Sequence, residues 1–351
     1  MRLNAEGVAA SRILKERRDA IAARVTSLYF QARPQLEQQW KAARQKCNED
    51  NRYHLDYLGE ALSFGQPALF IEYIAWVASV LDGLSIPGEA LAFNLHLLRT
   101  TLAAELAGAG GALASQYLDA ALANLDGAAP RHPSFLNGTR AIDALARDYL
   151  SALLRGERHA ASRLILGAAD GGTTVKDIYL LVFQRVQHEI GRLWQCNQIG
   201  VAQEHYCTAC TQLIMSQLYP RIFAGEKNGR RLVVTCVAGD LHEMGPRMVS
   251  DFFEMAGWDT FYLGASTPIR ATLQQLAERA PHVLAISVTL PLHLEAVADL
   301  IAATRAAGNP PRILVGGAPF NSVPGLWQDV GADGSACDAA EAIAVAGSWM
   351  D

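Results

Sequence analysis

Near residue 231 the spacing of apolar residues changes from a helical period to short β-rich runs separated by helical stretches. Four β-rich runs follow: 231–238 (RLVVTCVA), 260–264 (TFYLG), 282–289 (HVLAISVT) and 312–317 (RILVGG). The stretches with helical spacing lie near 245–256, 268–280, 292–307 and 338–349. Strands that alternate with helices in this way predict a parallel sheet with right-handed crossovers, that is, a Rossmann-like α/β domain.

The residues upstream of this change have helical spacing. Apolar side chains recur at intervals of three and four, for example at Leu55, Leu58 and Leu62. A stretch rich in Gly, Pro and polar residues, 127–139 (GAAPRHPSFLNGT), interrupts this pattern and has the composition of a linker. We therefore expect three domains: an all-α domain at 1–128, a helical bundle at 129–225 and the α/β domain at 226–351.

Charge and apolar content argue against several classes of function. The chain has 30 Lys and Arg residues against 35 Asp and Glu residues, a net charge of −5, so we expect no nucleic-acid partner. The N-terminus lacks the apolar core of a signal sequence, and no run of about 18 apolar residues could span a bilayer. Six cysteines are too few for a disulfide scaffold. We expect a cytoplasmic protein with no membrane partner.

Polar residues follow the first β-rich run, at the sheet edge where ligands of open parallel sheets bind. The segment Gly239-Asp240-Leu241-His242 contains no GxGxxG, so the dinucleotide fingerprint is absent. A His at this edge is a good metal ligand, and an Asp two residues earlier can hold its other ring nitrogen. The alternative interpretation is a polar loop His with an Asp that caps the next helix.

The string Asp240-x-His242-x-x-Gly245 resembles the signature of the cobalamin-binding domain, and two further elements extend the resemblance. Ser287-Val288-Thr289 follows Gly245 after 41 residues, and Gly316-Gly317 follows Thr289 after 26 residues. The resemblance implies that His242 ligates cobalt from below in place of the cofactor's own base, with Asp240 orienting the ring and Leu241 in the same loop. It also implies a channel for the displaced nucleotide tail, lined by Gly245, Ser287, Thr289, Gly316 and Gly317. Glycines suit such a channel because they have no side-chain bulk, and Ser287 supplies a hydroxyl donor.

The helical block before this domain contains Trp194, then nine residues, then Glu204-His205. This spacing is similar to that of adenosylcobalamin-dependent photoreceptors, in which the Trp lies over the adenosyl group and the Glu and His contact it. An indole can stack on adenine, and a carboxylate can accept hydrogen bonds from ribose hydroxyls. The alternative is that Trp194 is a core aromatic and Glu204-His205 a helix surface. Gln195 stands where some members of that family carry a second cobalt-binding His.

The N-terminal pattern around residues 51–81 looks like the sensor domain of photocobilins, which add a globin-like, biliverdin-binding domain to a cobalamin photoreceptor. Candidate bilin contacts by residue type are Tyr53, His54, Tyr57, Tyr73, Trp76 and His96. The alternative is a plain helical dimerisation domain in which these residues are core aromatics and surface histidines.

Together these resemblances imply a light sensor and not an enzyme. Adenosylcobalamin would be bound base-off with His242 on cobalt, biliverdin would occupy the N-terminal domain, and photolysis of the cobalt–carbon bond would change the assembly of a homo-oligomer. The main alternative is a corrinoid carrier protein of a methyltransferase system, which also joins a helical bundle to this α/β domain but must expose the upper face of the cofactor. A third reading is a cobalamin store or an orphan mutase subunit.

Overall fold

The computed structural model describes residues 4–39, 41–106, 108–125, 133–223 and 225–350. The chain forms two compact units. Unit 1 comprises Met1–Pro130 with the segments Thr289–Asp299 and Ala318–Gly331, and unit 2 comprises Arg131–Val288, Leu300–Gly317 and Ala332–Asp351. Positions 127–132 of the expected linker lie outside the described residues, and the three expected domain ranges stay a prediction.

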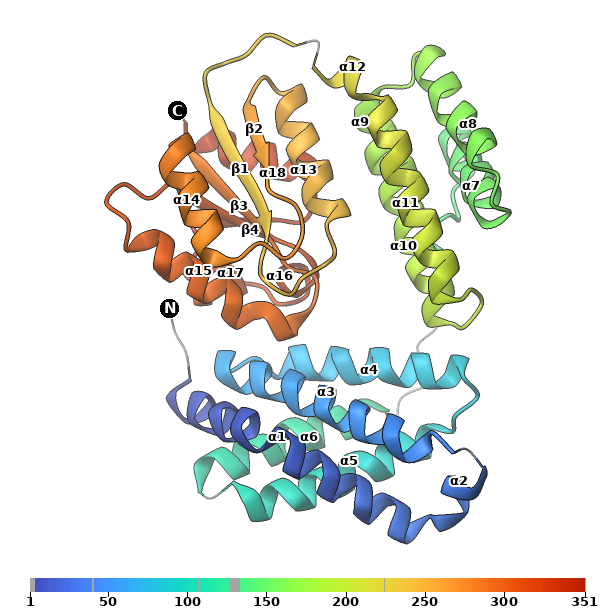
Figure 1. Ribbon diagram of the computed structural model, residues 1–351, viewed down its shortest axis with the longest axis vertical. Coiled ribbons are helices and arrows are strands. Elements are labelled where there is room, and N and C mark those ends of the chain that lie inside the picture. Colours follow the sequence, from blue (N-terminus) through green and yellow to red (C-terminus); the bar gives the residue numbers. More distant parts are fainter. Residues whose placement is uncertain (1–3, 40, 107, 126–132, 224, 351) are drawn as a thin grey trace. The chain divides into compact units, whose positions relative to one another are not determined.

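The N-terminal part of unit 1 is helical, as the spacing of its apolar residues predicts (Figure 1). Its helices are α1 (Ala5–Ala32), α2 (Pro34–Gln39), α3 (Ala43–Phe64), α4 (Pro67–Gly83), α5 (Gly88–Glu105) and α6 (Ala109–Leu125). Gly65 caps the end of α3, and its φ of +64° is the left-handed conformation that glycine favours; Pro67 begins α4. The all-α prediction is confirmed, whereas the globin-like detail stays a prediction.

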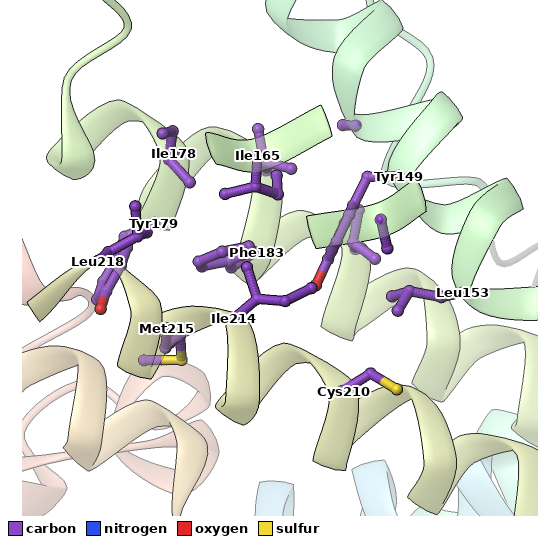
Figure 2. Packing of buried hydrophobic residues seen from close by; sticks show 14 of the residues in the cluster. Tyr149, Leu153, Ile165, Ile178, Tyr179, Phe183, Cys210, Ile214, Met215 and Leu218 are labelled. Carbon is purple, nitrogen blue, oxygen red and sulfur yellow. The ribbon is translucent and has the colours of Figure 1, made fainter. Parts of the chain in front are cut away.

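Unit 2 begins with a helical bundle. Its elements are α7 (Ala141–Leu154), α8 (Arg158–Asp170), α9 (Val175–Asp177), the π-helix η1 (Ile178–Phe183), α10 (Gln184–Gln195), α11 (Val201–Gln217) and α12 (Tyr219–Ile222). The Thr174 hydroxyl accepts the Asp177 N–H at 3.0 Å and so caps the start of α9. Tyr149, Phe183 and Ile214 meet in the apolar core between these helices (Figure 2).

A parallel sheet with crossover helices completes unit 2. Its strands are β1 (Arg231–Cys236), β2 (Asp259–Tyr262), β3 (Val283–Ser287), β4 (Arg312–Gly316) and β5 (Gly334–Ala336), in the order β2-β1-β3-β4-β5. The connecting helices of the α/β region, some of which cluster with unit 1, are α13 (Met244–Met255), α14 (Ile269–Arg279), η2 (Pro291–His293), α15 (Leu294–Arg305), α16 (Ala318–Ser322), α17 (Leu326–Asp329) and α18 (Ala339–Ser348). The four predicted strands are confirmed, and β5 was missed because three residues carry no strand pattern.

The strand register places the expected site residues in one row. Cys236 pairs with Ser287, and Ser287 pairs in turn with Gly316, so the carboxyl ends of β1, β3 and β4 lie side by side. The strand order reverses direction between β1 and β3, which is the point where ligands bind on sheets of this kind. Among the described residues, no helix has the length and apolar character needed to cross a membrane.

A buried hydrogen bond joins the bundle to helix α13. The Tyr179 hydroxyl donates to the Asp251 carboxylate at 2.8 Å, and Phe252 of α13 belongs to the same apolar cluster as the bundle. Burial raises the pKa of Asp251 to about 6. The carboxyl group therefore depends on its protein donor, because water does not reach it freely.

Replacing Tyr179 by Phe should lower the free energy of unfolding by about 1–3 kcal/mol, because the buried Asp251 carboxyl loses its donor. Tyr149→Phe is the matched control. Tyr149 bonds to Thr211 at 2.9 Å, and Thr211 keeps its bonds to Gln187 and to the Cys207 carbonyl. Urea unfolding followed by circular dichroism measures both variants, and an equal loss in the two would contradict the role given to Asp251.

Candidate functional site

The loop between β1 and α13 holds a His against a buried Asp. Asp240 is 1% exposed, and its carbonyl accepts the Ser266 N–H at 2.9 Å. Its Oδ1 accepts two hydrogen bonds from His242, one from the backbone N–H at 3.0 Å and one from ring Nδ1 at 2.8 Å. With Nδ1 committed to the carboxylate, Nε2 is the ring nitrogen left for a metal. The His242 side chain is 52% exposed, so a ligand can reach it.

The surroundings of His242 fit a large, flat, partly apolar ligand. Leu241, the residue before His242, is 72% exposed. Gly245 is exposed, and a Cβ at that position would meet nothing within 4 Å. An exposed imidazole, an exposed leucine and open space beside a glycine leave room at this loop for a large ligand such as a corrin ring.

A buried thiol lies behind this loop. Cys236 ends β1, and its Sγ lies 3.8 Å from the carbonyl oxygen of His242. Burial raises the pKa of Cys236 to about 12, so the thiol stays protonated near neutral pH. Metal binding by His242 stays a prediction.

The ends of β3 and β4 approach each other closely. The Val288 N–H donates to the Gly316 carbonyl at 3.0 Å, and Gly317 has a φ of +111°. A Cβ at Gly317 would lie 1.8 Å from the Val288 carbonyl oxygen. Gly317 is therefore required by the packing of the chain itself, whatever it also contributes to a ligand channel. Ser287 and Thr289 are half-buried on either side of Val288.

One polar face of α11 ties the bundle to the His242 loop. Four side chains spaced by one helical turn share this face: Glu204, Thr208, Gln212 and Ser216. Gln212 donates to Glu243, the residue after His242, at 2.9 Å, and Arg247 of α13 donates to Ser216 at 2.8 Å. Because Glu204 continues the same face, it lies toward the side of the helix that carries these contacts.

Trp194 and Glu204-His205 lie at the same end of a helix pair. Trp194 stands near the end of α10 and Glu204 in the first turn of α11, and the connection between these helices is short. Thr208 donates to the Glu204 carboxylate at 3.0 Å, and His205 Nε2 lies 3.4 Å from Glu204. The His205 side chain is 74% exposed, and Trp194 is half-buried. Contact of these three residues with a ligand stays a prediction.

Tyr262 and Gln212 hold the loop between β1 and α13, and neither was predicted from the sequence. Tyr262 of β2 donates to the Glu243 carbonyl at 3.0 Å, and Glu243 also receives the bond from Gln212. Both contacts join elements far apart in the chain, so no local sequence pattern predicts them.

Cys207 and Cys210, which form an isolated CxxC, lie in the bundle core. Among the described residues, no group of three potential metal-binding side chains occurs.

The candidate bilin residues of unit 1 pack mainly on one another. Tyr57 stacks on Tyr73 with ring centroids 3.7 Å apart, and the ring of Trp76, which is 40% exposed, lies 6.4 Å from that of Tyr73. His54 is buried with Nδ1 2.9 Å from the Tyr73 hydroxyl, and burial lowers its pKa to about 4. Tyr53 on α3 and His96 on α5 are exposed. The burial and stacking of Tyr57 and Tyr73 favour the alternative interpretation, core aromatics, for these two residues.

Comparisons with known proteins agree with the cobalamin resemblance. A family model described as "B12 binding domain" matches residues 230–344, and a second model with the same description matches residues 145–219. The dimethylamine corrinoid protein 3 of Methanosarcina acetivorans is 32% identical over 34% of this chain, and the dimethylamine corrinoid protein of Methanosarcina barkeri is 30% identical over 38%. The chain spans 57% and 62% of the lengths of these relatives.

The structure of the Methanosarcina barkeri monomethylamine corrinoid protein shares the fold. It has a TM-score of 0.53 at 20% identity and covers 59% of this chain and 98% of that protein.

The expectation of a light sensor is wrong. The relatives found include several proteins named as dimethylamine corrinoid proteins, which match the alternative of a corrinoid carrier better than a light sensor. Biliverdin, signalling and a light-dependent homo-oligomer have no support in these comparisons. The spacing of Trp194 and Glu204-His205 suggested the photoreceptors, but it describes two helices and their connection and does not identify an upper ligand.

Replacing Gly317 by Ala should destabilise the protein without any cofactor. Strain at its positive φ alone costs about 1–3 kcal/mol, and the contact with the Val288 carbonyl adds to it. Gly245→Ala is the control, because a Cβ there meets open space and alanine favours the helix by up to about 1 kcal/mol. Thermal unfolding of the apoprotein measures both, and wild-type stability of the Gly317 variant would contradict the close approach.

The His242–Asp240 pair stands at the carboxyl edge of a five-stranded parallel sheet, and both the sheet region and the preceding bundle match B12-binding family models. This chain is a cobalamin-binding protein.

Proposed function

We propose that this chain is a corrinoid carrier protein of a methyltransferase system. The observation that carries the proposal is the exposed His242 held by a buried Asp240, in a chain whose relatives are named as dimethylamine corrinoid proteins. In this role the chain is not an enzyme by itself, as expected from the sequence. A cytoplasmic location belongs to the same proposal.

The residues have separate tasks in binding. His242 would hold cobalt through Nε2, and Asp240 keeps the proton on Nδ1 and fixes the ring. Leu241 would lie against the corrin. Bound cobalamin supplies a cobalt centre that exchanges a methyl group between a donor and an acceptor. The nucleotide tail would lie in a channel lined by five residues: Gly245, Ser287, Thr289, Gly316 and Gly317.

The upper face would be bordered by Trp194, Glu204 and His205. A methyl carrier must leave this face within reach of its partner enzymes, and the exposure of His205 agrees with that requirement. An adenosyl group in this position is the finer prediction from the sequence, and it is tested below. Biliverdin in unit 1 is tested by co-expression with a biliverdin source, where absence of red absorbance rejects it.

Histidine ligation has a direct spectroscopic test. In the cobalt(II) state, nitrogen splitting in the electron paramagnetic resonance spectrum should change when the histidines of the protein are labelled with ¹⁵N. His242→Ala should remove that change, and Asp240→Asn should weaken hydroxocobalamin binding about 10- to 100-fold. Asp119→Asn is the control, because Asp119 is an exposed residue of α6 that pairs with Arg99 of α5 at 3.0 Å. If the ¹⁵N label does not change the spectrum of the wild-type protein, His242 is rejected as the cobalt ligand.

The nature of the upper face follows from comparing two cofactors in the dark. If the face is open, methylcobalamin and adenosylcobalamin should bind with dissociation constants within about tenfold of each other, that is, within about 1.4 kcal/mol. Trp194→Ala should then change the two dissociation constants by a similar factor. Trp76→Ala, at another tryptophan, is the control. A strong adenosyl preference that Trp194→Ala removes would contradict an open face and support the adenosyl prediction.

A further inference from the structure

Two segments of the α/β region cluster with the N-terminal helices in unit 1. These segments are Thr289–Asp299 and Ala318–Gly331. The first begins two residues after Ser287, at the end of β3, and the second directly follows Gly317, after the end of β4. Both therefore emerge from the strand ends to which the nucleotide tail of the cofactor is assigned.

The first contact centres on a buried carboxylate. Glu60 of α3 is 3% exposed, and its Oε2 accepts the Glu295 N–H at 3.2 Å, in the first turn of α15. Its Oε1 lies 3.3 Å from Nζ of Lys15 on α1, and Lys15 also binds the Glu295 carboxylate. Burial raises the pKa of Glu60 to about 8, and the ammonium group of Lys15 opposes this shift. The three side chains together fix the start of α15.

A second contact holds the other segment. Gln66, at the start of α4, donates to the Asp329 carboxylate at 3.1 Å at the end of α17. Helix α16 also packs against α4. The N-terminal helices are thus attached to both segments by polar contacts that do not share a residue.

The tether between the fixed helix and the expected site is short. Thr289 precedes Glu295 by six residues, and three of the intervening residues form the 3-10 turn η2 (Pro291–His293). A short, turn-containing tether transmits the position of its anchored end, because few backbone angles remain free to absorb a shift. Fixing the start of α15 therefore restricts where Thr289 can lie.

We infer that Lys15 and Glu60 are positioning residues for cofactor binding. They hold the start of α15 and thereby the segment from Thr289 to α15, the Thr289 loop, in the arrangement that receives the nucleotide tail. This inference rests on the proposed cobalamin site. By linkage, insertion of the tail strengthens the contact between this loop and the N-terminal helices to the same degree. The N-terminal helices then respond to insertion of the tail through this loop.

The test compares the full-length chain with two corrinoids, hydroxocobalamin and cobinamide, which lacks the nucleotide tail. Lys15→Met should weaken hydroxocobalamin binding about three- to tenfold and leave cobinamide binding unchanged, since only the tail needs the Thr289 loop. Arg18→Met is the matched control, because Arg18 lies one turn further along α1 and pairs with Asp56 of α3 at 3.1 Å. The control should bind both corrinoids as the wild type does.

Glu60→Gln provides a second variant, which keeps a hydrogen-bond acceptor for Glu295 but loses the charge that Lys15 binds. It should shift the ratio of the two dissociation constants in the same direction as Lys15→Met. An unchanged ratio in both variants, or equal weakening of both corrinoids, would overturn the inference. Failure of the proposed site itself is distinguishable, because then the wild type would bind neither corrinoid, or His242→Ala would bind both as well as the wild type does.

Discussion

The hydrogen bond between Asp240 and His242 is the constraint on which the proposed chemistry depends. A carboxylate that is 1% exposed is costly to bury, and the loop meets that cost by giving it two donors from one residue. The same two bonds fix the orientation of the imidazole before any ligand arrives. The ring is therefore preorganised, with little conformational entropy left to lose on metal binding.

The bundle and the sheet act on this loop together. Glu243, next to His242, receives hydrogen bonds from Gln212 of α11 and from Tyr262 of β2. The loop is thus held from the bundle and from the edge strand, while the polar face of α11 continues toward Glu204. Because one helix both anchors the loop and carries residues expected near the upper face, the two sides of the proposed site are mechanically connected through α11.

The fold and the candidate site could be predicted as far as contiguous sequence segments encode them. The strands β1 to β4 and the Asp240–His242 pair are encoded by contiguous segments, so period and spacing were sufficient. Strand β5, the Glu243 contacts and the Glu60–Glu295 bond depend on residues distant in the chain, and no sequence pattern brings such partners together. The light-sensor prediction was wrong for a related reason: the spacing from Trp194 to Glu204 reflects a helix, a turn and a second helix, a geometry compatible with more than one cofactor chemistry.

The buried Cys236 thiol has a consequence for the proposed carrier. A thiolate is a nucleophile and a ligand for soft metals. An ionised cysteine beside a methylated corrinoid would therefore compete for its methyl group. Desolvation at the end of β1 keeps this sulfur in its unreactive protonated form. In the proposed carrier, burial of Cys236 would therefore limit a side reaction in which this sulfur, and not the partner's acceptor, takes the methyl group.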